Sequence, residues 1–122
     1  MPGSSGPLEN LGVLALGVGD VSAARGYFDR AVSAAPGSSR AQAGLAEAAF
    51  RAGDRAVAYA AWRRAIELDP SNLEALYNLG INLVRDGRLA DARPYLLRFQ
   101  QTAPPAQHAE ALREVARLLA SR

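Results

Sequence analysis

The sequence predicts an all-α protein built from a repeated pair of helices. The main observation is that three columns of residues recur at a spacing of 34 positions. The columns are Gly19, Gly53 and Gly87, then Ala24, Ala58 and Ala92, then Pro36, Pro70 and Pro104. Between them, apolar residues follow helical spacing rather than the alternation of a strand. An example is the series Leu76, Leu79 and Leu83.

Each repeat unit begins with a helix that ends near a glycine, followed by a second helix that ends near a proline. Asp20 and Asp54 directly follow their glycines and are expected to cap the second helices, whereas Arg88 breaks this pattern. Pro94 lies beyond the first turn of its helix, so we expect a slight kink there. The predicted helices span residues 8–18, 21–34, 39–52, 55–68, 73–86, 89–102 and 106–120.

The predicted organisation is a short arm followed by three helix pairs and a last helix. Residues 1–6 are expected to be a disordered arm or an expression-vector remnant, because Gly, Ser and Pro dominate them. The pairs occupy residues 7–38, 39–72 and 73–105, and a C-terminal capping helix occupies residues 106–122.

The last helix carries charge on the face that would meet a further helix. These charged residues are Glu110, Arg113, Glu114 and Arg117. The apolar face predicted to dock on the preceding pair consists of Ala109, Leu112, Ala116 and Leu119, with Ala111, Val115 and Leu118 alongside. Because a terminal repeat needs a polar outer face, we expect this helix to end the stack. The first helix has no equivalent cap.

These residues together resemble the tetratricopeptide repeat (TPR) family over about residues 8–105. The matching positions are Leu8, Leu11, Gly12, Ala15, Ala24, Phe28 and Pro36, then Leu45, Ala46, Ala58, Trp62 and Pro70, then Leu76, Leu79, Gly80, Leu83, Ala92, Leu96 and Pro104. The resemblance implies a right-handed superhelical solenoid of three TPR helix pairs plus the C-terminal capping helix. In this fold Phe28 and Trp62 should be buried between paired helices.

The segment Gly17-Val18-Gly19 follows an apolar run, as a dinucleotide-binding loop would. The same turn recurs as Arg51-Ala52-Gly53 and Arg85-Asp86-Gly87, however, and no acidic residue lies about 20 positions beyond the first loop to hold a ribose. We therefore interpret all three as turns between helices.

Composition argues against catalysis and against metal binding. The chain has no cysteine, and His108 is its one histidine. Thiolate and paired-histidine metal sites and a Ser-His-Asp arrangement therefore lack their residues. We expect no enzymatic activity, no cofactor and no metal, and we interpret His108 as a surface residue.

Charge and hydropathy argue against nucleic-acid and membrane partners. The 14 basic residues, all arginine, nearly balance the 12 acidic ones and form no basic stripe. No apolar run is long enough to span a bilayer. Arginine without lysine suggests GC-rich, bacterial coding, and a cytoplasmic location is expected if the chain is complete.

The TPR resemblance implies a non-catalytic module that binds a protein or peptide partner in a concave groove lined by the first helix of each pair. The groove residues implied are Glu9, Asn10, Val13, Arg40, Glu47, Phe50, Arg51, Glu74, Tyr77, Asn78, Ile81 and Arg85. Tyr77 and Phe50 are the expected aromatic anchors. Arg51 and Arg85 are expected to be neighbours that hold an acidic group of the partner, unless both are solvated residues at helix C-termini.

Two other functions stay open. The uncapped N-terminal face could support self-association, so that the chain is a monomer or a weak homodimer. The chain could also be the C-terminal tail of a larger bacterial enzyme. One TPR branch clamps the C-terminal carboxylate of heat-shock chaperones with lysine, asparagine and arginine. The corresponding residues here are Glu9, Val13, Gly44, Glu74 and Asn78, so we do not expect that role.

Overall fold

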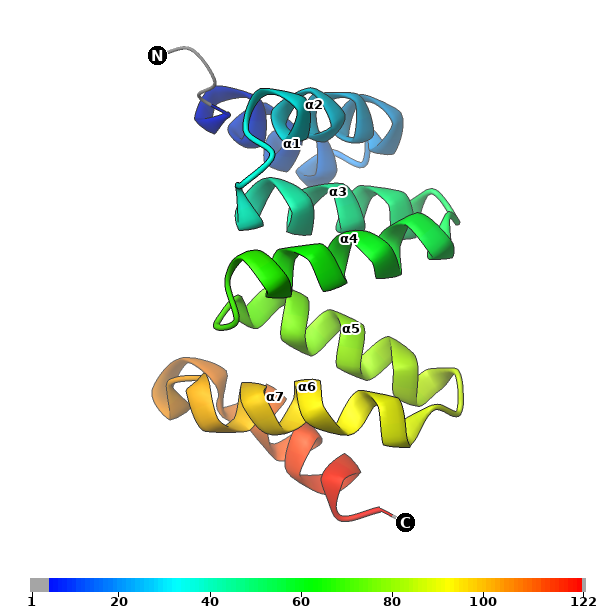
Figure 1. Cartoon of the computed structure of the whole chain (residues 1–122), viewed down its shortest axis with the longest axis vertical. Helices are drawn as coiled ribbons and strands as arrows, with labels where there is room; N and C mark the ends of the chain where they lie inside the picture. Colours follow the sequence, from blue (N-terminus) through cyan, green and yellow to red (C-terminus); the bar gives the residue numbers. More distant parts are fainter. Residues whose placement is uncertain (1–4, 122) are drawn as a thin grey trace. The chain divides into compact units, whose positions relative to one another are not determined.

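The computed structural model describes residues 5–121, which form seven α-helices and no β-strand (Figure 1). The helices are α1 (Gly6–Gly17), α2 (Val21–Ala34), α3 (Ser39–Arg51), α4 (Arg55–Leu68), α5 (Leu73–Arg85), α6 (Leu89–Thr102) and α7 (Pro105–Leu119). Their ends differ from the predicted ones by at most two residues. The all-α prediction is confirmed.

The arm predicted at residues 1–6 is too long. Residues 1–4 lie outside the described part of the chain, but Gly6 already begins α1. The Ser5 hydroxyl donates a hydrogen bond to the Glu9 carboxylate one turn further on. Pro7 in the first turn also favours an early start, because its fixed φ suits a helix and no N–H is needed there.

The turns inside the three helix pairs follow the predicted pattern. Gly19, Gly53 and Gly87 have φ of +81°, +86° and +78°, a left-handed conformation that glycine adopts without strain. Asp20 accepts from the Ala23 N–H at 3.1 Å, and Asp54 accepts from the Val57 N–H at 3.3 Å. These caps begin α2 and α4, whereas α6 begins after Arg88 without a side-chain cap.

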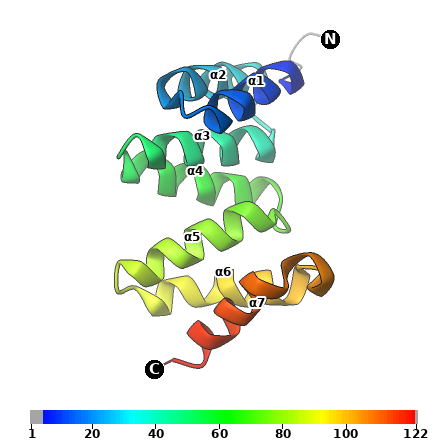
Figure 2. The same cartoon turned by 180° about the vertical axis from the view of Figure 1, so that it is seen from behind.

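The chain divides into two compact units, and the first, Met1–Asn72, contains α1 to α4. The helices α1 and α2 pair, as do α3 and α4, and each pair lies side by side in opposite views (Figures 1 and 2). α3 packs on α2 and also contacts α1. The two pairs therefore stack, which places the first helices α1 and α3 next to each other.

Phe28 is the centre of this packing. Its ring is 1% exposed, and it extends from α2 between Gly12 of α1 and Gly44 of α3. A Cβ atom at Gly12 would lie 2.6 Å from the Phe28 ring, and one at Gly44 would overlap the opposite edge. Trp62 is also 1% exposed. The prediction that both aromatic residues are core residues is confirmed.

The second unit, Leu73–Arg122, contains the hairpin of α5 and α6 followed by α7. Leu96 of α6 packs against Gly80 of α5, which repeats the contact between Phe28 and Gly12 in the first unit. α6 is one continuous helix although Pro94 lies inside it. The Arg93 guanidinium donates to the Leu119 carbonyl at 3.2 Å and so ties the C-terminus of α7 to α6.

The predicted face of α7 needs correction. Val115 is fully buried, and Ala111, Leu112, Leu118 and Leu119 are partly buried around it. Ala109 and Ala116, which were assigned to the docking face, are exposed instead. The backbone at His108 is non-helical, with φ −129° and ψ 28°, so the register of the earlier repeats does not carry over into α7.

Candidate functional site

Three of the predicted groove residues of the first unit meet at the N-terminal ends of α1 and α3. Arg40 contacts the Glu9 carboxylate at 3.4 Å and donates to the Asn10 side-chain oxygen at 3.2 Å. Glu9 also accepts from the Ser38 hydroxyl at 3.2 Å and is only 5% exposed. Glu9 is therefore a buried, paired carboxylate that joins the two helices, and it offers a partner little surface.

Two more predicted residues meet at the other end of α3. The Arg51 guanidinium donates to Glu47 at 2.8 Å and to the Leu16 carbonyl, near the end of α1, at 3.2 Å. Arg51 therefore holds the C-terminal ends of α1 and α3 together. Val13 lies along α1 between the two polar clusters and is 51% exposed.

Phe50 lies apart from these clusters. Its ring packs on Trp62 of α4 with a centroid separation of 5.6 Å, and the Arg55 guanidinium lies 5.6 Å from its centroid. Phe50 is half-buried against α4, and it contacts none of the predicted groove residues in these interactions. Arg55, which covers it, was not a predicted site residue.

Tyr77 is the centre of the predicted site in the second unit. Its ring packs on the ring of Phe99 with a centroid separation of 5.3 Å. Its hydroxyl donates a hydrogen bond to the Glu114 carboxylate at 3.4 Å. Burial, followed by the negative charge of Glu114, raises the pKa of the Tyr77 hydroxyl above its usual value. The sequence predicted Tyr77 as an anchor but did not predict that α7 would supply its polar partner.

Two adjoining pockets surround Tyr77. The first, about 270 Å³, is lined by Leu73, Glu74, Tyr77, Asn78, Phe99, His108 and Ala111. The second, about 360 Å³, is lined by Tyr77, Gln107, His108, Glu110, Ala111 and Glu114. Three predicted residues, Glu74, Tyr77 and Asn78, therefore come together with a wall from α7 that the prediction omitted. The sequence signal for this wall is the four-residue separation of Glu110 and Glu114 on one helix face, which the sequence analysis assigns to the polar outer face of the capping helix.

The remaining predicted residues of the second unit do not join this pocket. Ile81 is 5% exposed and belongs to the core, so its assignment to an open groove is wrong. Arg85 is exposed at the end of α5. Arg51 and Arg85 lie in different units, so their predicted proximity stays a prediction.

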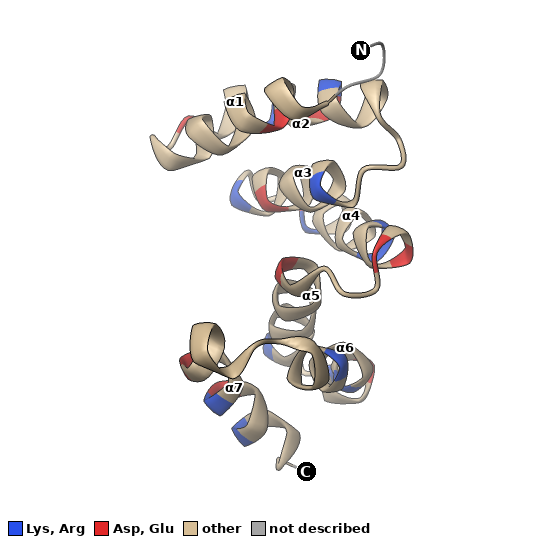
Figure 3. Ribbon diagram, turned by 90° about the vertical axis from the view of Figure 1, so that its left-hand side faces the viewer, with Lys and Arg blue, Asp and Glu red and all other residues tan. Residues whose placement is uncertain are grey.

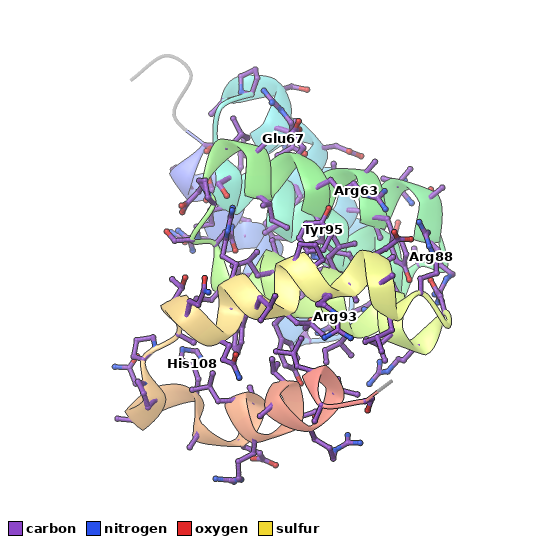
Figure 4. The ribbon with its side chains drawn as sticks, turned by 60° about the horizontal axis from the view of Figure 1, so that its bottom comes forward. Arg63, Glu67, Arg88, Arg93, Tyr95 and His108 are labelled. Atoms are coloured by element: carbon purple, nitrogen blue, oxygen red, sulfur yellow. The ribbon has the colours of Figure 1, made fainter. Side chains whose placement is uncertain are left out.

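His108 is less exposed than the sequence suggested. It lies in the first turn of α7 (Figure 4) and contacts Phe99 edge-on, with a centroid separation of 5.9 Å. It is half-buried and lines both pockets. The non-helical backbone at His108 therefore positions its ring against Phe99 and beside Tyr77.

Residues 5–121 contain neither a cluster of metal ligands nor a helix suited to a lipid bilayer. Within that range, no three histidine or acidic side chains are grouped closely enough to hold a metal ion. None of the helices there combines the length and apolar character needed to cross a lipid bilayer.

Comparison with known proteins decides the family. A sequence profile described as tetratricopeptide repeat matches residues 9–58 and 44–107, which together cover most of the chain. The chain belongs to the tetratricopeptide repeat family. No curated protein matched this TPR chain in a sequence search.

Solved TPR structures share its fold. The TPR2B domain of yeast Sti1, in a pHsp70 complex, aligns with a TM-score of 0.81 and 19% identity over 94% of this chain and 92% of that one. The first TPR of Spaghetti (RPAP3), bound to the HSP90 peptide SRMEEVD, aligns with a TM-score of 0.81 and 23% identity over 97% of each chain. The Yersinia enterocolitica type III secretion chaperone SycD, in complex with a peptide of the translocator YopD, aligns with a TM-score of 0.82 and 20% identity. The alignment covers 93% of this chain and 87% of that one.

Proposed function

We propose that this TPR chain binds an extended or helical peptide segment of a partner protein along its first helices, α1, α3 and α5, without catalysis of its own. The observation that carries this proposal is the side-by-side arrangement of α1 and α3, with polar side chains fixed at both ends of the pair. Such preorganised side chains lower the entropy cost of binding. That three structures of this fold were solved with a partner or peptide supports the same function.

The heat-shock chaperone C-terminus is not the partner we propose. Of the residues at the clamp positions, Glu9 is buried and already paired, and Gly44 faces the Phe28 ring. Neither can donate a hydrogen bond from a side chain to a carboxylate. The partner therefore needs a different recognition feature.

Within the proposed groove, Tyr77 supplies aromatic contact and Arg85 supplies a cation for an acidic group of the partner. Arg85 is exposed, whereas Arg51 already bonds Glu47 and the Leu16 carbonyl. The acidic group should therefore contact Arg85 rather than Arg51. A short peptide held in this way should bind with a Kd in the micromolar range, which corresponds to a binding free energy of about −8 kcal/mol.

The test is selection of peptides from a random phage-displayed library, followed by calorimetry on the wild type and three variants. We expect Tyr77→Ala and Arg85→Ala each to weaken binding of the selected peptides by about tenfold or more. Arg98→Ala is the matched control, because Arg98 is an exposed arginine of the same unit on the second helix α6. Failure to select any binding peptide, or equal loss in Arg98→Ala, would contradict the proposal.

A second candidate function, self-association, is favoured by the apolar surface of α1. Leu11, Leu14 and Val18 are 42%, 67% and 82% exposed. Together with Ala23 and Tyr27 of α2 they line a shallow depression of about 270 Å³. Contiguous exposed apolar side chains of this kind mark interaction surfaces. We propose that two copies of the chain can pair through this face.

Sedimentation equilibrium over a range of concentrations tests the pairing. The wild type should shift toward twice the monomer mass as its concentration rises, and a Leu14→Glu/Val18→Glu variant should remain monomeric. Leu97→Glu is the control, because Leu97 of α6 is 40% exposed and lies in the other unit. A wild type that stays monomeric at every concentration would exclude this function.

A further inference from the structure

The pockets beside Tyr77 contain a group of side chains suited to a positive charge. Tyr77, Phe99 and His108 form a chain of ring contacts, with centroid separations of 5.3 and 5.9 Å. Phe99 is buried, so this aromatic wall is held in place by the core of the second unit. The electron-rich face of an aromatic ring attracts cations such as guanidinium and ammonium groups.

Two carboxylates lie on the same side of α7 and line the larger pocket. Glu110 and Glu114 are four residues apart, so they are neighbours on one helix face and repel each other. Among residues 5–121, neither forms an ion pair, although Arg113 and Arg117 are also on α7, where both signs of charge occur (Figure 3). A bound cation would relieve this repulsion.

The field of these carboxylates reaches the pocket. After burial, the charge and hydrogen bond of Glu114 raise the pKa of the Tyr77 hydroxyl; Arg85 opposes them with a smaller effect, and Glu110 adds the smallest contribution. Arg85 follows Tyr77 by eight residues, or about 12 Å along the axis of α5. Glu110 and Glu114 line the larger pocket and Arg85 does not, so the negative charges lie at the pocket wall, although the charge of Arg85 also acts on the Tyr77 hydroxyl.

We propose that the pocket formed by Tyr77, His108, Glu110 and Glu114 binds a cationic side chain, arginine or lysine, of a partner polypeptide. This inference rests on the proposed function only in assigning the cation to a partner polypeptide. A pocket of about 360 Å³ is near the lower end of the range for small-molecule sites, which suits one side chain better than a whole ligand. Two carboxylates and an aromatic face would together hold a guanidinium.

The test uses N-acetyl-L-arginine amide as the probe, titrated into the full-length, ¹⁵N-labelled chain and followed by NMR. The probe should shift the amides of Tyr77, His108, Ala111 and Glu114 with a Kd in the millimolar range. N-acetyl-L-citrulline amide, which has nearly the same shape without the charge, should bind about three- to tenfold more weakly. The Glu110→Gln/Glu114→Gln variant should bind the arginine probe more weakly by the same factor. Added salt should also weaken the binding of the arginine probe to the wild type.

Glu67→Gln is the control, because Glu67 is an exposed carboxylate of α4 in the other unit, and this variant should bind the probe as the wild type does. Equal affinity for citrulline, unchanged affinity in the double variant, or shifts centred on residues away from α5, α7 and Phe99 would overturn the inference. Selected peptides that bind the wild type while the arginine probe leaves the pocket unshifted would refute this inference alone. Pocket shifts without any selectable peptide would refute the groove-binding function and leave the cation pocket standing.

Discussion

The contact between Phe28 and Gly12 explains why small residues recur at fixed positions of the repeat. The ring of Phe28 fills the space between α1 and α3, and both Gly12 and Gly44 leave room for it. The same relation joins Leu96 and Gly80 in the second unit. The 34-residue period is thus a packing requirement, because a bulky residue of one helix needs a gap on the next.

Gly12→Ala should destabilise the protein by about 1–3 kcal/mol, because the new methyl group would overlap a ring that cannot move. Gly44 lies against the opposite edge of the Phe28 ring, so the ring has no space into which it could move. Gly26→Ala is the matched control, since Gly26 lies in α2 with nothing near its Cβ position, and it should stabilise by about 0.5–1 kcal/mol. Urea denaturation measures both. Equal effects of the two substitutions would refute this account of the packing.

Asp54 predicts a defined dependence of stability on pH. Its hydrogen bond with the Arg25 guanidinium, at 3.0 Å, lowers the pKa of the Asp54 carboxyl below its usual 3.8, and the Val57 N–H adds to the effect. The resulting stabilisation is fully present above the unfolded pKa and is lost as pH falls through the lower folded pKa. Asp54→Asn keeps a capping oxygen but loses the charge, so it should be less stable than the wild type near neutral pH.

The difference in unfolding free energy between wild type and Asp54→Asn should shrink as pH falls below 3.8. Asp20→Asn is the control, because Asp20 caps α2 but forms no ion pair within residues 5–121, and it should cost less stability near neutral pH. Urea titrations at several pH values give these numbers. A wild-type advantage that stays constant down to the lowest pH would rule out the charged contact.

At the scale of the helix, the sequence period predicted where each helix begins and ends, but it predicted less well which face of a helix is buried. Glycine, proline and aspartate signals placed α2, α4 and α6 with the ends that the structure shows. These signals are local, so they can be interpreted without knowing the neighbours. The buried face of α7 depended instead on the non-helical backbone at His108, which no repeat position predicts.

Pro94 is the residue of α6 least suited to its position. It is exposed and lies inside the helix, where it lacks the N–H that would bond to the preceding turn. Pro94→Ala should restore that hydrogen bond without opening a cavity and should stabilise the protein by up to about 3 kcal/mol. Thermal unfolding followed by circular dichroism measures the change. A lower melting temperature would mean that the proline ring contributes packing that its exposure does not suggest.

At the scale of the whole molecule, the sequence predicted which helices exist but not which side chains satisfy each other. Glu9 was expected to face a partner, yet a carboxylate that becomes buried needs a counter-charge and hydrogen bonds, and Arg40 and Ser38 supply them. Arg51 likewise bonds the end of α1. These pairings depend on the approach of helices about 30 residues apart in sequence, which a repeat pattern does not specify.

Local stability should vary along the chain, because each repeat contacts only its neighbours. Among the described residues, α3 packs on α2 and α4 and contacts α1, whereas α1 packs mainly on α2, contacts α3 and has an exposed apolar side. Amide hydrogen exchange should therefore be slower in α3 than in α1. Equal protection in all helices of the first unit would show that this unit opens only as a whole.

Whether the first helices bind the partner can be measured by mapping a selected peptide on the 122-residue chain by NMR. Shifted amides should concentrate in α1, α3 and α5, together with α7 where the peptide carries a basic side chain. Shifts confined to the second helices α2, α4 and α6 would contradict it.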